Sequence, residues 1–320
     1  MVATQPVPTT IQSPFPDIEI PEVPLPAFVL WRAHELGDKP ALIDAVSGRQ
    51  VSYRQLVDSI RRAACGLHRR GFTKGDVLAL YSPNLPEFAI AYYAVASLGG
   101  VVTTINPLAT VDELASQLAD SGARWLVSAP LCLDKALQAA DRAGLDQVYV
   151  FGDAAAGASA FDVLLADDAP LPQVPIDVHT DIIALPYSSG TTGLPKGVML
   201  SQANLVANLA QLEGIEPVTE HDTLIAVLPF FHIYGMEVVL HRGLYKGATL
   251  VTMPRFELEP FLAALQQHAV TRAYLVPPIV LALAKHPVVE QYDLSALKTI
   301  VGGAAQACAC ALCASSLVGR

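Results

Sequence analysis

The sequence predicts an α/β protein with largely parallel, doubly wound sheets. Apolar runs of strand length alternate with segments of helical periodicity before residue 152, and the same alternation resumes after residue 180. A length of 320 residues allows one large domain or two modest ones with an ample core. We therefore expect two βα-alternating subdomains.

The first alternation opens with a capped helix. Ser52 and Gln55 form a capping box, and apolar residues follow it at helical spacing as far as Leu67. A second capping pair, Thr110 and Glu113, predicts another helix start. Strands are expected at 77–81, 101–105, 125–127 and 148–151, and further helices at 88–98 and 133–143.

The second alternation begins with an apolar run at 182–185, which is expected to be a buried strand. Ser201 then opens a helical pattern that continues to Leu212. Strands are expected at 224–228, 248–252, 273–276 and 298–301, and helices at 258–269 and 279–285.

These patterns divide the chain into four parts. A proline-rich segment, 1–27, is expected to be extended. The first α/β subdomain covers 28–180, and its last part, 152–180, is expected to be a surface connection because it lacks sustained periodicity. The second subdomain covers 181–305. An aberrant tail, 306–320, holds three of the five cysteines and indicates a shifted reading frame with early termination, although a genuine short apolar helix is the alternative.

Composition excludes several classes of protein. The net charge of −10, without long charge runs, argues against nucleic acid as a partner. The uncharged stretch 88–111 is broken by Gly99-Gly100 and Asn106-Pro107, so no membrane span is expected. No secretory signal is visible, which favours the cytoplasm. The cysteines are expected to be free thiols, and no Cys/His spacing suits zinc.

One loop stands out chemically. Residues 187–197 read YSSGTTGLPKG and combine four hydroxyl side chains, glycines and Lys196 between a strand and a helix. Backbone N–H groups, hydroxyls and an ammonium are what a polyphosphate needs. The spacing differs from a P-loop, because Gly197 follows the lysine where Ser or Thr is required. A solvated turn is the alternative.

The loop resembles the nucleotide-binding loop of the adenylate-forming enzymes, which include acyl- and aryl-CoA ligases. The block LPFFHIYG at 228–235 resembles that family's next motif. The run from MPRFEL at 253–258, through VPPIV at 276–280, to YDLS at 292–295 is similar to the 4-coumarate–CoA ligase branch. The resemblance covers about Ser13 to Ala305. It implies an ATP-dependent acid–CoA ligase that converts a carboxylate, ATP and CoA into acyl-CoA, AMP and pyrophosphate.

The resemblance also implies roles for individual residues. Mg²⁺ would bridge the phosphate oxygens, with no metal ligand assigned in the protein. His232 would be catalytic near the substrate carboxylate, with a packed core histidine as the alternative. Tyr234 would face the same pocket wall by strand alternation, with Val238 further along it, or Val238 would simply pack in the core. Arg255 would contact CoA, or be a solvated arginine. The ATP-binding residues would be Ser188, Ser189, Gly190, Thr191, Thr192 and Lys196, and small residues of the substrate pocket would be Gly303 and Ala304.

The resemblance ends near Ala305. The family would continue with a Tyr-Gly-x-Thr-Glu block, an aspartate for the ribose, and a small C-terminal domain with a lysine. We therefore expect an N-terminal fragment that does not turn over, unless a complementing C-terminal fragment docks with it. The substrate stays open between hydroxycinnamate-like and fatty acids. A non-catalytic nucleotide- or acyl-binding remnant is the alternative from another class.

Overall fold

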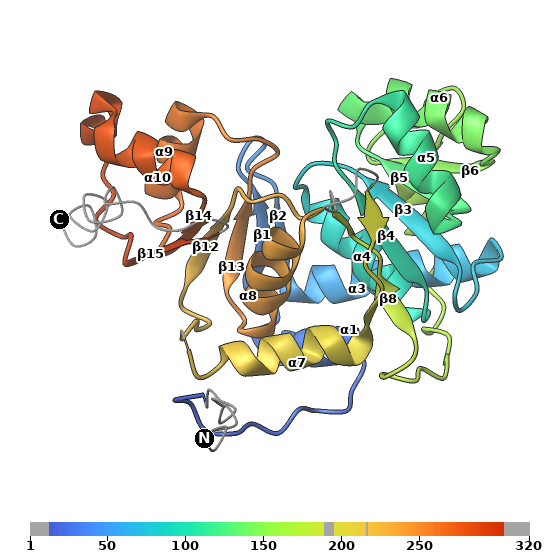
Figure 1. The fold of residues 1–320 in the computed structure, drawn as a ribbon, viewed down its shortest axis with the longest axis horizontal. Helices are drawn as coiled ribbons and strands as arrows, with labels where there is room; N and C mark the ends of the chain where they lie inside the picture. Colours follow the sequence, from blue (N-terminus) through green and yellow to red (C-terminus); the bar gives the residue numbers. More distant parts are fainter. Residues whose placement is uncertain (1–12, 189–194, 216, 304–320) are drawn as a thin grey trace, which may run out of the picture.

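The structure, a computed structural model, describes residues 13–188, 195–215 and 217–303. These residues form two largely parallel sheets with helices between and outside them (Figure 1). One sheet has six strands in the order β15-β14-β12-β13-β1-β2, and the other has seven in the order β11-β8-β4-β3-β5-β6-β7. Within these sheets the described antiparallel pairs are β1–β2 and β8–β11. The expected α/β class is confirmed.

The expected strands are present and agree with the structure to within about two residues. The six-stranded sheet consists of β1 (Pro40–Asp44), β2 (Gln50–Ser52), β12 (Thr223–Ala226), β13 (Thr249–Thr252), β14 (Arg272–Leu275) and β15 (Thr299–Gly302). The seven-stranded sheet consists of β3 (Val77–Tyr81), β4 (Val101–Ile105), β5 (Trp125–Ser128), β6 (Gln147–Val150), β7 (Ser159–Ala160), β8 (Ile182–Ala184) and β11 (Leu200–Ser201). A separate antiparallel pair consists of β9 (Tyr187–Ser188) and β10 (Lys196–Gly197).

Side-chain caps set the starts of three helices that the sequence predicted, α3, α5 and α7. Ser52, Thr110 and Ser201 each accept a hydrogen bond from a backbone N–H three residues on. The α-helices are α1 (Leu25–Val29), α2 (Ala33–Leu36), α3 (Tyr53–Arg69), α4 (Pro86–Ser97), α5 (Val111–Ser121), α6 (Leu133–Ala143), α7 (Gln202–Leu212), α8 (Arg242–Tyr245), α9 (Leu258–Gln267) and α10 (Pro277–Lys285). Short 3₁₀ turns are η1 (Pro130–Cys132), η2 (Phe161–Leu164) and η4 (Pro287–Gln291), and η3 (Tyr234–His241) is a π-helix.

Apolar cores lie on both faces of each sheet. The largest fills the space between the sheets, where α3, α4, α7 and η3 pack. A second lies under α9 and α10 on the outer face of the six-stranded sheet, and a third under α5 and α6 on the outer face of the seven-stranded sheet. Helix α4 is buried along most of its length, because apolar sheets flank it on both sides. This position explains the uncharged stretch 88–111.

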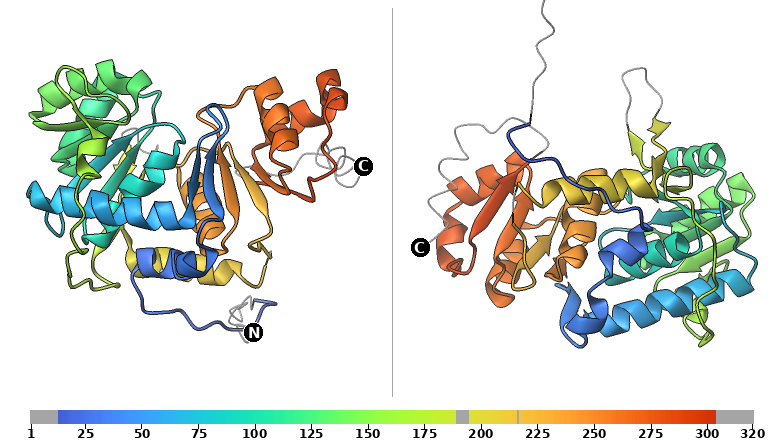
Figure 2. Two further views of the ribbon diagram at one scale, coloured as in Figure 1. Left: turned by 180° about the vertical axis from the view of Figure 1, so that it is seen from behind. Right: turned by 90° about the horizontal axis from the view of Figure 1, so that it is seen from below.

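The two sheets exchange strands across the boundary expected near residue 180. Strand β1 pairs with β13, with Leu42 opposite Leu250. Strand β8 pairs with β4, with Val102 opposite Ala184. Strands β1 and β2 were not expected from the sequence, because both are short and the parallel partner of β1, strand β13, lies far along the chain. The view from behind in Figure 2 shows β1 and β2 within the six-stranded sheet, beside α3.

Two expected segments differ from the prediction. Residues 152–180 are more than a surface connection, because Phe161 and Leu164 are fully buried. A Cβ at Gly66 of α3 would come within 2.2 Å of the Leu164 carbonyl oxygen, so this close packing needs the glycine. Residues 13–24 contain no helix or strand, but Leu25, expected in the extended segment, begins α1.

The structure also bears on the expectations for a membrane span and for the cysteines. No described helix has both the length and the apolar character required to cross a bilayer. Cys65 and Cys132 are buried free thiols, and the other three cysteines lie outside the described residues.

Candidate functional site

Loops that follow β4, β8 and β12 converge at the carboxyl ends of these parallel strands, where ligands bind in open α/β sheets. The hydroxyl of Thr104 donates to the carbonyl of Phe231 at 2.7 Å, and the hydroxyl of Thr103 donates to that of Leu185 at 3.0 Å. A cleft of about 730 Å³ opens here. It is lined by residues that include Asn106, Ser116, Gln117, Asp120, Tyr187, Ser188, Pro195 and Phe231.

The two flanks of the predicted phosphate loop meet at this cleft. Ser188 lies opposite Lys196 in the β9–β10 pair, and both side chains are exposed. Among the described residues Lys196 has no ion-pair partner, so its ammonium is available to an anion. The hydroxyl of Tyr187 donates to Asp120 at 2.5 Å, which ties β9 to α5. The predicted residues Ser189, Gly190, Thr191 and Thr192 lie outside the described residues.

Asn84 holds the turn after β12, and the sequence analysis missed it. Its side-chain amide donates to the carbonyls of Ala226 and Leu228 at 2.9 and 2.8 Å. Its oxygen accepts from the N–H of Phe230 at 2.7 Å. The side chain is buried, so these bonds join the two sheets in a dry environment. A polar residue just after the buried strand 77–81 was the available signal.

His232 lies at the start of the helical segment that follows this turn. Its side chain is exposed, and its Nδ1 accepts from the N–H of Tyr234 at 3.2 Å. A neutral ring that accepts at Nδ1 carries its proton on Nε2, which can donate to a carboxylate. The alternative of a packed core histidine is wrong for this residue.

The alternation argument for Tyr234 is wrong, because the chain is helical from Ile233. Gly235 permits this turn: a Cβ there would come within 2.2 Å of the carbonyl oxygen of Pro229. Tyr234 therefore projects from a helix, with Val238 four residues further along it. Both side chains are half-buried and pack against the core between the sheets.

The ring of Tyr234 lies directly against Gly303, so the structure brings these two predicted residues together. A Cβ at Gly303 would come within 2.4 to 2.6 Å of the tyrosine hydroxyl and ring. The N–H of Gly303 donates to the carbonyl of Leu275 at 3.0 Å, which fixes the backbone after β15. Ala304 lies outside the described residues.

Arg255 does not line the cleft. It follows β13, its side chain is 81% exposed, and it forms an ion pair with Glu257. His232 and Lys196 do not line the cleft either, although each directly follows a residue that does.

The carboxylates near the cleft have structural partners. Asp112 pairs with Arg142. Glu113 caps α5, and hydrogen bonds from the backbone and hydroxyl of Thr110 lower its pKa. Desolvation, and then the hydrogen bond to Asp120, raise the pKa of Tyr187. These contacts give Asp112 and Glu113 structural roles at α5.

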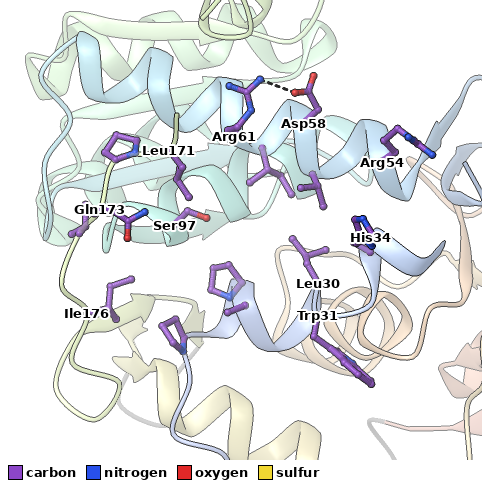
Figure 3. Close-up of a pocket in the computed structure, with 18 of the residues that line it drawn as sticks. Leu30, Trp31, His34, Arg54, Asp58, Arg61, Ser97, Leu171, Gln173 and Ile176 are labelled. Carbon is purple, nitrogen blue, oxygen red and sulfur yellow. Dashed lines mark hydrogen bonds and ion pairs between the residues drawn. The ribbon is translucent and has the colours of Figure 1, made fainter. Parts of the chain in front are cut away.

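A larger cavity, of about 970 Å³, lies elsewhere, between α1, α2, α3 and residues 171–176 (Figure 3). Its apolar lining includes Trp31, Leu171 and Ile176, and Arg61 at its edge pairs with Asp58 at 2.7 Å. None of the residues predicted for function lines it. The cleft beside Ser188 is therefore the better candidate despite its smaller volume.

The chain is similar to known proteins over most of its length. The family model described as "AMP-binding enzyme" matches residues 29–312. The chain is 42% identical over 299 residues to 4-coumarate–CoA ligase 5 of Oryza sativa subsp. japonica, covering 92% of this chain and 55% of that relative. It is 40% identical over 300 residues to 4-coumarate–CoA ligase 2 of Petroselinum crispum, with the same coverage.

Solved structures share the fold. A long-chain-fatty-acid–CoA ligase from Archaeoglobus fulgidus superposes with a TM-score of 0.87 at 26% identity, covering 96% of this chain and 63% of that one. A red-emitting luciferase from Phrixothrix hirtus gives a TM-score of 0.86 at 24% identity, covering 94% and 76%. The chain thus spans about 55% of the length of the curated relatives.

Proposed function

Because this chain belongs to the AMP-binding enzyme family, we propose that it provides the nucleotide- and acid-binding part of an ATP-dependent acid–CoA ligase. The observation that carries the proposal is the pairing of Ser188 with Lys196 beside a cleft that Phe231, the neighbour of His232, also lines.

The proposed reaction has two steps. A carboxylate oxygen of the acid attacks the α-phosphorus of ATP, the bond to the bridging oxygen breaks, and pyrophosphate leaves. The thiolate of CoA, whose proton passes to solvent, then attacks the acyl carbon and releases AMP. Negative charge accumulates on the departing pyrophosphate in the first step, so fixed donors and cations near it lower the barrier.

In this proposal Lys196 and the hydroxyl-rich loop hold the β- and γ-phosphates. Support comes from the exposed ammonium of Lys196 and from the position of Ser188 directly across the strand pair. Mg²⁺ would arrive with the nucleotide, since the described residues contain no cluster of three metal-ligating side chains. When bound, it would neutralise phosphate charge.

His232 would donate from Nε2 to the acid's carboxylate and hold it for attack on phosphorus. Tyr234 and Val238 would form one wall of the acid pocket, and Gly303, which packs against the Tyr234 ring, would continue it together with Ala304. Support comes from the accepting role of Nδ1, which directs the donor of a neutral ring to Nε2.

Arg255 would bind a phosphate of CoA. Its guanidinium is exposed and its described partner, Glu257, is a half-exposed carboxylate. An exposed pair of this kind contributes little to stability, so a phosphate can replace the carboxylate.

We propose an aromatic acid, such as a hydroxycinnamate, as the substrate, because the relatives with about 40% identity are 4-coumarate–CoA ligases. The solved fatty-acid ligase at 26% identity supports a fatty acid as the second candidate. Calorimetric titration with 4-coumarate and with a medium-chain fatty acid separates the two. Tighter binding of the fatty acid would reject the aromatic assignment.

The test of the nucleotide site is calorimetry with Mg·ATP. Lys196→Ala should weaken binding about 10- to 100-fold, since a charged hydrogen bond contributes about 1.5–3 kcal/mol. Lys285→Ala, which removes an exposed lysine at the end of α10, is the matched control and should bind like the original chain. Equal affinity of the Lys196 variant would remove this residue from the site.

Turnover is a separate question. We expect no steady pyrophosphate release from these 320 residues alone, because they span about 55% of the length of the curated relatives. Addition of a C-terminal portion of a longer relative should restore release if the two parts dock. Steady turnover by the chain alone, lost in Lys196→Ala, would contradict this expectation. Mg·ATP binding without turnover in either assay would favour the non-catalytic alternative.

A further inference from the structure

A buried polar cluster lies between α4 and η3, away from the cleft. It consists of Tyr92, Tyr93, Glu237 and His241, whose side chains are between 0% and 3% exposed. The hydroxyl of Tyr93 lies 2.6 Å from Nδ1 of His241. The imidazole centroid is 4.9 and 5.4 Å from the ring centroids of Tyr92 and Tyr93. Burial raises the pKa values of both tyrosines and Glu237 acts electrostatically to raise them further, so the four side chains form one group.

Several polar atoms of this cluster have no hydrogen-bond partner among the described residues. They are the hydroxyl of Tyr92, both carboxyl oxygens of Glu237, and Nε2 of His241. Buried polar atoms in folded proteins are almost always hydrogen-bonded to protein or to ordered water. Three orphaned side chains from two helices therefore indicate a shared partner that is not a protein group.

The chemistry of the three groups defines that partner. Burial raises the pKa of Glu237 well above 4.5, which favours the neutral carboxyl, and lowers the pKa of His241 to about 3, so the imidazole is neutral near pH 7. If His241 accepts at Nδ1 from Tyr93, its Nε2 carries a proton and donates. The neutral carboxyl and the Tyr92 hydroxyl can each donate or accept. Such a set lacks the anionic oxygens that would attract a cation, and it suits a small molecule with two donors and two acceptors.

We propose that Tyr92, Glu237 and His241 bind one buried water molecule that joins α4 to η3 and makes Tyr92 and Glu237 positioning residues. Buried waters commonly make about three hydrogen bonds, which matches the three orphaned side chains. Tyr234 precedes Glu237 by three residues and Val238 follows it directly, so the water would fix the helix that carries the proposed acid pocket. This second role rests on the proposed function.

Double-variant cycles test the water site without any ligand. Tyr92→Phe and Glu237→Leu should each lower the unfolding midpoint by a few degrees, on the order of 5 °C. The double variant should lose little more than the worse single variant, because either change removes the shared water. Tyr93→Phe breaks the direct hydrogen bond to His241 and not the water site. The decrease in unfolding midpoint that it causes should therefore add to the decrease caused by Glu237→Leu.

At about pH 4, where burial keeps the Glu237 carboxyl neutral, Glu237→Gln should retain the midpoint of the original chain, because a neutral amide can also bind the water. Strictly additive losses for Tyr92→Phe and Glu237→Leu would overturn the proposal. A high-resolution crystal structure should show a water within hydrogen-bonding distance of all three side chains, and an empty site would also overturn it.

Ligand binding tests the positioning role. Glu237→Leu should weaken 4-coumarate binding several-fold and leave Mg·ATP affinity unchanged, and Glu237→Gln should restore the acid's affinity. Unchanged acid affinity in Glu237→Leu, or an equal loss for both ligands, would reject positioning. If the original chain binds no aromatic acid, the proposed function fails, whereas the double-variant cycle still decides the water site.

Discussion

At the scale of single residues, the absence of one methyl group sets how closely β15 approaches the helix that carries Tyr234. The tyrosine ring occupies the space that a side chain at position 303 would need. Position 302 differs, because nothing lies within 4 Å of a Cβ built there. Of these two adjacent positions, only 303 requires a glycine for steric reasons.

Gly303→Ala should therefore displace the Tyr234 ring and lower the unfolding free energy by about 1–3 kcal/mol, the usual cost of overpacking. Gly302→Ala is the matched control and should cost far less. Denaturant unfolding measures both. In a Tyr234→Ala background the cost of Gly303→Ala should largely vanish, and an unchanged cost would contradict the contact.

At the scale of elements, the site depends on side chains that hold loops in place. The start of η3 was not predictable from the sequence. The block LPFFHIYG follows a strand, so the alternation of side chains typical of a strand was applied as far as Tyr234, where the chain is already helical. Gly235 and its contact with Pro229 decide the turn, and that contact is tertiary. The capped helices were predictable, because Ser52 and Thr110 act on backbone groups three residues away.

Asn84→Ala should destabilise the turn after β12. The carbonyl of Ala226 would keep its bond from the N–H of Met253. The carbonyl of Leu228 and the N–H of Phe230 would each lose the Asn84 side chain as a partner, at about 1–3 kcal/mol per unsatisfied group. Chemical denaturation should show this loss, and affinity for the aromatic acid should fall with it. Asn208→Ala, at an exposed position of α7 away from the cleft, is the control and should change little. Equal stability of the two variants would contradict the role of Asn84.

The buried carboxyl of Glu237 predicts a dependence of stability on pH. The pKa of this carboxyl is raised in the folded chain, so its contribution to the free energy of unfolding is fully present below pH 4.5. That contribution is lost as the pH rises through the raised pKa. The groups near it are Tyr92, Tyr93 and His241. The unfolding midpoint of Glu237→Gln should therefore gain on that of the original chain between pH 5 and pH 8. Parallel curves would show that Glu237 ionises normally.

At the scale of the whole molecule, the order of strands leaves β15 at one edge of the six-stranded sheet. The N–H groups of Thr299 and Gly303 donate toward β14. Because successive residues of a strand alternate, the N–H of Gly302 points away from β14. No described strand pairs with this outer edge, and such edges favour association.

Gly302→Pro should reduce concentration-dependent association, because proline removes the outward N–H and leaves the bonds to β14 intact. Gly302→Ala keeps that N–H and should associate like the original chain. Size exclusion with light scattering over a concentration series measures this. Equal association by the proline variant would show that the edge is not the contact.

The sequence was most informative where structure is local and least informative where it is not. Runs such as 77–81 and 101–105 have the length and apolar character of buried strands, so they could be placed closely. The residues Asn84 and Thr104 hold the candidate site through contacts with segments more than 100 residues away, which no local pattern reveals. The resemblance to the family predicted Tyr234 and Gly303 as separate site residues, and only the structure shows that they are in contact.

The exchange of strands between the sheets has a consequence for how the chain is made. The hydroxyl of Thr249 donates to the carbonyl of Pro40, 209 residues earlier in the sequence. At a synthesis rate of about 5–20 residues per second, β1 leaves the ribosome roughly 10–40 s before its partner strand exists. Strands β3 to β6 can pair with one another during that time. The first strands to be synthesised are thus among the last to find their sheet, and a nascent chain must keep them from binding elsewhere.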